Sequence, residues 1–122
     1  MKITLLGDDA VRLEDAPGMM TIEAASTDQA YSPFHMLASA VASCTFSVLH
    51  SWAAHAGLDA AALKVEVRWA FAESPHRVGE IAVTLDWPRL PEARREAARR
   101  AAALCTVSKT LEHPPKITID AR

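Results

Sequence analysis

Cysteine is scarce in this 122-residue sequence: only Cys44 and Cys105 are present, far apart in the chain. Zinc sites usually draw on closely spaced pairs such as Cys-x-x-Cys, so the commonest metal-binding motif is missing. A net charge of -2 provides no general field for nucleic acid or anionic lipid. The N-terminus, MKITLLGDDAV, has too short an apolar run for a signal peptide. We therefore expect a cytoplasmic protein with reduced thiols and neither nucleic-acid nor membrane partners.

The dominant feature is an apolar stretch from Ser32 to Ala56 that reads as one long helix. Ser32 is a suitable N-cap, Pro33 suits the first helical position, and Gly57 is the expected stop. A helix that is apolar all round is either buried or spans a membrane, and the serines and histidines along this one argue against a membrane. We predict a central core helix that carries Cys44 into the interior.

The rest of the chain predicts strands around this helix and a second helix after them. Alternating apolar residues from Leu63 to Phe71 and from Arg77 to Trp87 predict a long hairpin with one exposed face. Glu92 to Cys105 has an alanine stripe at helical spacing opposite four arginines, which predicts the second helix. Further strands are expected at 2–6, 10–13, 19–24 and 116–120, with single helical turns at 59–62 and 106–111. The length suits one domain, 1–122, and covering so apolar a helix favours a dimer.

The cysteines alone leave three interpretations open. Buried cysteine often acts as a small hydrophobic residue, so inert core is the simplest interpretation. Redox chemistry needs two thiols within reach of one another and a cavity for substrate. A metal site formed by Cys44 with His35 or His50 is disfavoured, because both histidines lie on other faces of the helix.

The sequences around the two cysteines provide a more specific indication. SPFHMLASAVASC has a Ser-Pro start and an alanine-rich helix that reaches Cys44, and CTVSKTL places Cys105 in a turn with Ser108 three residues later. In this order, and with the strands between them, these motifs resemble the OsmC/Ohr family of thiol-dependent hydroperoxide reductases. The resemblance covers nearly the whole chain.

The resemblance implies an α/β (α+β) fold with antiparallel sheets packed around the cysteine helix, in an intertwined homodimer whose sites lie at the interface. It implies that Cys44 is the peroxidatic cysteine, which becomes a sulfenic acid, and that Cys105 is the resolving cysteine, which forms a disulfide with it. It also implies an organic hydroperoxide as substrate and an external dithiol, of the lipoyl type, as reductant. We expect no cofactor and no metal.

Four positions depart from the family or are uncertain. Peroxidase members have a glutamate directly after the Ser-Pro pair, paired with an arginine that stabilises the thiolate; here that position is Phe34. His35 either takes over as a polar neighbour of the site or faces water. Arg12 is the best candidate for the family's arginine, although a solvated strand residue is an equal alternative. Thr106, in place of the usual proline after the second cysteine, is a mild change.

Two functional hypotheses follow. The first is a dimeric peroxidase that reduces organic hydroperoxides through Cys44 and Cys105 in oxidative stress defence. The alternative is an OsmC-like protein without peroxidase activity, which binds a small apolar ligand at the dimer interface or senses redox state through its thiols. Both thiols favour the first hypothesis, and Phe34 favours the second.

Overall fold

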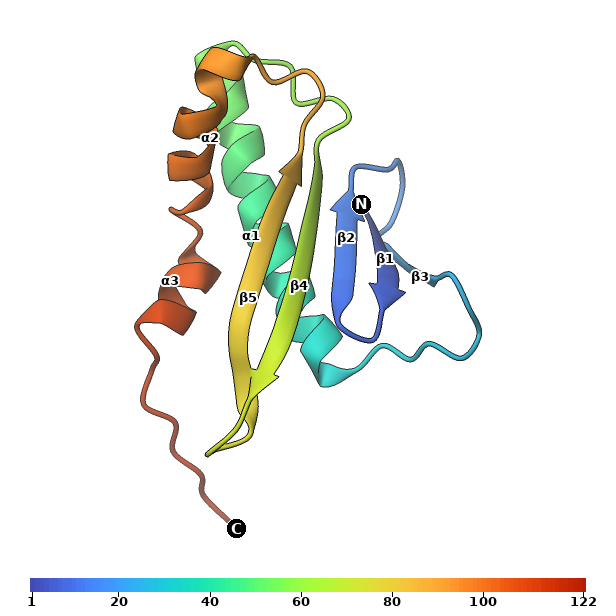
Figure 1. The fold of residues 1–122 in the computed structure, drawn as a ribbon, viewed down its shortest axis with the longest axis vertical. Coiled ribbons are helices and arrows are strands. Elements are labelled where there is room, and N and C mark those ends of the chain that lie inside the picture. Colours follow the sequence, from blue (N-terminus) through green and yellow to red (C-terminus); the bar gives the residue numbers. More distant parts are fainter.

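A five-stranded mixed sheet and three helices make up the structure, a computed structural model that describes residues 1–122 (Figure 1). The elements in chain order are β1 (Lys2–Gly7), β2 (Ala10–Glu14), β3 (Thr21–Ala24), α1 (Pro33–Ala56), β4 (Lys64–Ala72), β5 (Arg77–Asp86), a 3₁₀ turn η1 (Glu92–Arg94), α2 (Arg95–Ala102) and α3 (Thr106–Glu112). This is the α+β class predicted from the sequence, with the long hairpin β4–β5 and the central helix α1 confirmed.

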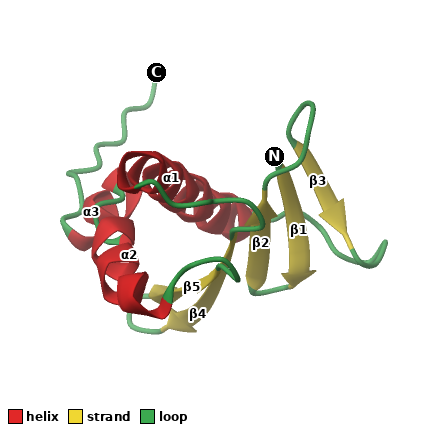
Figure 2. Cartoon of the chain, turned by 90° about the horizontal axis from the view of Figure 1, so that it is seen from above, coloured by secondary structure: helices red, strands yellow, loops and turns green.

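The strand order is β3-β1-β2-β4-β5, and the helices lie on one side of the sheet (Figure 2). The three pairs β1–β2, β2–β4 and β4–β5 are antiparallel, whereas β3 runs parallel to β1. The expectation of purely antiparallel sheets is therefore wrong for β3. The reason is topological: the chain crosses from β2 past β1 before β3 begins, so that β3 points the same way as β1.

Helix α1 is fixed at both ends by the predicted caps. The Ser32 side chain accepts a hydrogen bond from the His35 backbone N–H, and Gly57 ends the helix in the left-handed conformation with φ of 68°. Its length and composition alone would allow it to cross a membrane, but it packs on β2 and β4 as a core helix does.

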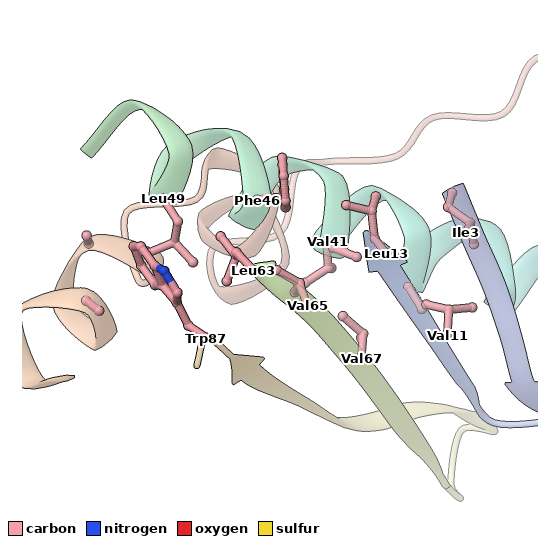
Figure 3. Close-up of a cluster of buried hydrophobic side chains, with 14 of the residues drawn as sticks. Ile3, Val11, Leu13, Val41, Phe46, Leu49, Leu63, Val65, Val67 and Trp87 are labelled. Carbon is pink, nitrogen blue, oxygen red and sulfur yellow. The ribbon is translucent and has the colours of Figure 1, made fainter. Parts of the chain in front are cut away.

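The core lies between α1 and the sheet. Val41 and Leu49 of α1 meet Leu13 of β2 and Val65 and Val67 of β4, and all five side chains are buried (Figure 3). Alternation along each strand turns the charged residues to the opposite face. Each fully buried aliphatic side chain contributes about 1.5–3 kcal/mol, so this packing holds α1 in place on the sheet.

The predicted helix from Glu92 to Cys105 is interrupted in the structure. After η1 it runs only from Arg95 to Ala102, and its buried residues are Ala98 and Ala101. Of the expected stripe of Ala93, Ala97, Ala101 and Leu104, only Ala101 is fully buried. Cys105 does not end this helix but caps the next one, since its sulfur accepts the backbone N–H of Ser108. A cap must leave the helical conformation, which is why α2 and α3 are separate.

The C-terminal strand predicted at 116–120 is not formed. These residues run as an exposed, unpaired tail beyond α3, with Ile117 and Ile119 largely exposed (Figure 1). A strand needs a neighbour to pair its backbone groups, and no strand edge of this chain lies beside the tail. Residues 59–62 form a turn rather than a helical turn, because the Asp59 carboxylate accepts the Ala61 N–H.

Candidate functional site: a pair of thiols

The two cysteines, far apart in the sequence, meet between α1 and α3. Cys44 is half-buried in the middle of α1, and Cys105 is completely buried at the start of α3. Helix α3 packs on α1, which places the two cysteines close enough for each thiol to shift the pKa of the other. Both thiols are free. The structure thus provides the closeness of two thiols that a redox pair requires.

Several hydrogen-bond donors surround this pair. The Ser108 backbone N–H donates to the Cys105 sulfur over 3.4 Å, and the side chains of Ser108 and Thr45 also face that sulfur. Hydrogen bonding by the backbone of Val107 and Thr106 lowers the pKa of the Cys44 thiol, against the effect of burial. Thr45 directly follows Cys44 on α1 and is buried, so its hydroxyl points inward to the pair rather than to water. Donors of this kind favour a thiolate over a thiol.

The donors are distributed unequally, and the two thiols therefore differ. Burial raises the pKa of the Cys44 thiol, and the hydrogen bond with Cys105 raises it further, so that this pKa lies above its ordinary value. Burial also raises the pKa of Cys105, but the hydrogen bonds from Cys44, Ser108 and Thr45 outweigh it and bring that pKa below its ordinary value.

A groove runs along the helix-facing side of β5 and passes two residues that neighbour the cysteines in sequence, Thr45 and Ser108. Helices α2 and α3 pack mainly on α1, and the space between them and β5 holds three adjoining cavities of about 470, 390 and 230 Å³. The smallest is lined by Thr45 and Ser108, the two residues that face Cys105. Val83 and Leu85 of β5 line two of the three cavities, and Val83 remains exposed although it faces the helices. The groove is thus partly apolar and open beside Thr45 and Ser108, whereas neither cysteine lines it.

His35 occupies neither position expected from the sequence. It is buried, with its ring edge-on to Trp69 at a centroid distance of 5.0 Å. Its Nδ1 accepts the Ser32 backbone N–H, so the ring proton lies on Nε2, which donates to the Gly7 carbonyl oxygen over 2.9 Å. His35 therefore ties the start of α1 to the β1–β2 turn, on the side of α1 away from Cys44.

Phe34 lies in the first turn of α1, where the family has its glutamate. Its ring packs edge-on against Phe71 of β4 at a centroid distance of 4.8 Å, and it is 37% exposed. Ten helical residues separate it from Cys44, a rise of about 15 Å. Within one chain, Phe34 therefore does not reach the thiol pair.

Arg12 does not lie near Cys44 within the chain either. Its neighbours Val11 and Leu13 face α1, so the alternation of β2 turns Arg12 to the opposite face of the sheet. There its Nε lies 3.3 Å from the Glu14 carboxylate, an ion pair without the alignment of a hydrogen bond. A role for Arg12 at the thiols remains a prediction that needs a second chain.

No sequence pattern pointed to Thr45, and Ser108 was identified only as part of the motif that begins at Cys105. Neither residue type is a signal by itself, because serine and threonine are common on helices. The one available indication was that both lie within three residues of a cysteine. No group of three or more histidine, cysteine, aspartate or glutamate side chains is arranged to hold a metal ion.

Comparison with known proteins gives one family and a structural relative. The sequence profile of the OsmC-like proteins matches residues 26–120. No curated protein sequence matches the chain significantly. Among solved structures, the chain is similar to one from Psychrobacter arcticus 273-4 that is described as an osmotic stress induced and detoxification response protein. The two are 25% identical, with a TM-score of 0.62, over 88% of this chain and 84% of that chain.

Proposed function

Because the chain belongs to the OsmC-like protein family, we propose that it is a thiol-dependent peroxidase that reduces organic hydroperoxides through Cys44 and Cys105. The observation that carries this proposal is the closeness of the two thiols, which come from distant parts of the sequence. The description of the Psychrobacter relative supports a role in stress response and detoxification for this chain too.

The two cysteines differ in access, which assigns their roles. Cys44 is half-buried and reachable, so it is the thiol that attacks the hydroperoxide, whereas the buried Cys105 attacks the resulting sulfenic acid to form the disulfide. An external dithiol of the lipoyl type then returns both sulfurs to the reduced state. The reaction needs no cofactor, because both electrons come from the thiols.

The groove along β5 supports an organic rather than an inorganic peroxide. Val83 and Leu85 offer an apolar wall to an alkyl or aryl group, while Thr45 and Ser108 mark the polar end that neighbours the cysteines. Hydrogen peroxide has no apolar part and would gain nothing from this wall. We propose that the protein acts in the cytoplasm as a homodimer, in which a second chain covers the apolar surfaces left exposed.

The experiment that tests this function is stopped-flow oxidation of the reduced protein by cumene hydroperoxide and by hydrogen peroxide. Wild-type protein should lose two thiols per chain, faster with the organic peroxide. Cys44→Ser should abolish the reaction, and Cys105→Ser should stop at a sulfenic acid that dimedone traps. Oxidation no faster than that of a small free thiol would exclude the peroxidase.

Phe34 favours a second candidate, a binding protein on the same fold. It places a partly exposed aromatic ring beside Phe71 where the family glutamate would be, which suits an apolar ligand better than a thiolate. In this case an apolar fluorescent probe should bind with the thiols blocked, and Phe34→Ser should weaken binding. Probe binding without any peroxide reaction would favour this candidate, or a redox sensor, over the enzyme.

A further inference from the structure

Two of the four arginines on the second helical segment line the groove, and two do not. Arg95 and Arg99 lie four residues apart on α2, which places both on the face of that helix directed to β5. Arg94 and Arg100 line none of the three cavities of the groove. The structure thus separates a pair of cations at the groove from the rest of the exposed face of this segment.

The cavity that this pair lines is the largest of the three, about 470 Å³, a size at which proteins bind small molecules. The opposite wall is formed by the end of β5 and the segment after it. Its apolar residues are Val83, Leu85, Trp87, Pro88 and Leu90. Val83 remains 39% exposed although it faces the helices, so the wall has apolar surface that a ligand can bury.

Acidic side chains do not cancel the charge of the two arginines. Asp86 borders the cavity, but the alternation along β5 turns its side chain to the outer face of the sheet, where it stands opposite Lys64 of β4. Glu112 lines only the two smaller cavities and pairs with Lys109 over 3.6 Å. The largest cavity therefore has an apolar wall on one side and two positive charges on the other.

Both arginines are available to a ligand. Arg95 pairs with Glu92 over 2.9 Å and Arg99 with Glu96 over 3.0 Å, and all four side chains are mostly exposed. Ion pairs so exposed contribute little to stability, so exchanging them for a bound anion costs little. Like charges four residues apart on a helix also repel each other, and an anion between them removes that repulsion.

We propose that the cavity between α2 and β5 is a binding site for alkyl carboxylates, in which Arg95 and Arg99 bind the carboxylate and the wall with Val83 and Leu85 contacts the alkyl chain. A guanidinium group presents parallel N–H donors that match the two oxygens of a carboxylate. Binding uses neither thiol, so the site goes beyond the proposed peroxidase and does not depend on it.

The competing occupant is the tail of a second copy of the chain, because Ile117 and Ile119 are apolar and Asp120 is acidic. The charge of the tail complements the two arginines poorly, however. It carries Lys116 and Arg122 as well as Asp120, and Asp120 already lies 3.6 Å from Arg122. A free carboxylate with an alkyl chain is therefore the better fit.

The test is isothermal titration calorimetry of the reduced full-length protein with octanoate. One octanoate should bind per chain. Propionate, which lacks most of the chain, and octylammonium, which reverses the charge, should each bind at least about tenfold more weakly, because each buried methylene and each charged hydrogen bond contributes to affinity. The titration contains no peroxide, so its outcome is independent of the peroxidase assay.

The variants are Arg95→Gln and Arg99→Gln, each of which should weaken octanoate binding about tenfold by removing a charged hydrogen-bond donor. Arg100→Gln is the matched control, because it makes the same charge change on the same helix but lines none of the three cavities. Its affinity should equal that of the wild type. All three side chains are exposed, so the variants should fold, which circular dichroism checks.

Three results would overturn the proposal. The first is no octanoate binding at millimolar concentration, or binding no tighter than that of propionate. The second is an equal loss of affinity in all three arginine variants, which would indicate general attraction of anions to α2. The third is binding only in the variant with both Ile117→Asp and Ile119→Asp, which would show that a second copy fills the cavity.

Discussion

At the scale of single residues, His35 shows how a side chain can be essential to the fold while resembling a site residue. It stands next to the position of the family glutamate, yet its ring is buried and both nitrogens have partners in the backbone of Ser32 and Gly7. Because Nδ1 accepts from Ser32 and Nε2 donates to Gly7, these hydrogen bonds favour one tautomer of the ring. It stabilises the junction of α1 with the sheet.

Replacement of His35 should therefore affect stability more than chemistry. His35→Ala leaves the Ser32 N–H and the Gly7 carbonyl without partners and opens a cavity beside Trp69, at an expected cost of about 2–4 kcal/mol. Urea denaturation measures the loss. His55→Ala is the control, because His55 is exposed near the other end of α1 and contacts only the Ser51 carbonyl of its own helix. Equal stability of the two variants would contradict the role assigned to His35.

At the scale of elements, the β4–β5 hairpin contains a bulge that a glycine makes possible. Phe71 pairs with Val78 and Ala70 with Glu80, so Gly79 is the extra residue of β5. A Cβ atom at Gly79 would collide with the Cβ of Ala72 on β4. The bulge sets the register of the residues from Ile81 onward, including Val83 and Leu85, which line the groove.

A double-mutant cycle tests this contact. Gly79→Ala should destabilise the protein by about 1–3 kcal/mol, since overpacking moves backbone or side chains from their places. Ala72→Gly removes the opposing methyl group, so the double variant should recover most of that loss. Thermal unfolding of the wild type, the two single variants and the double variant gives the coupling free energy between positions 72 and 79. Additive effects of the two changes would show that the two positions do not touch.

At the scale of the whole molecule, the isolated chain leaves much apolar surface uncovered. Large hydrophobic side chains are exposed on β3, on α1 and most strongly on the C-terminal tail, where Ile117 and Ile119 are 81% and 94% exposed. The tail alternates apolar and polar residues as a strand does, but has no partner in this chain. Exposure on this scale favours association with a second copy of the chain, in which the tail pairs as a strand with the sheet of that copy.

The oligomeric state should depend on this tail. We expect wild-type protein to sediment at twice the chain mass of 13.2 kDa, and Ile117→Asp with Ile119→Asp to shift it to the monomer, because each buried isoleucine contributes about 1.5–3 kcal/mol. The control is Lys116→Gln, which removes a charge from the same tail without removing apolar surface. This variant should remain dimeric. A wild-type protein that sediments as a monomer at micromolar concentration would contradict the prediction.

The proposed dimer also bears on the two residues that do not reach the thiols within one chain. Phe34 lies about 15 Å from Cys44 along α1, and Arg12 lies on the far face of the sheet. If Phe34 or Arg12 contributes to a thiol site, it therefore contributes to the site of the other chain in the dimer. The double tail variant should then lower the peroxide rate together with the mass, whereas a site complete in one chain would keep its rate.

The sequence by itself determined the parts of this protein that depend on near neighbours. The caps of α1 at Ser32 and Gly57 and the alternation of β4 and β5 involve residues a few positions apart, so their pattern is visible in the chain. Only the tertiary structure decided that Cys44 and Cys105 lie close together, that Thr45 faces Cys105 and that His35 is buried. These contacts join residues that meet only when α1 packs on α3 and on the sheet, and the energy of packing depends on shape and burial rather than on sequence spacing.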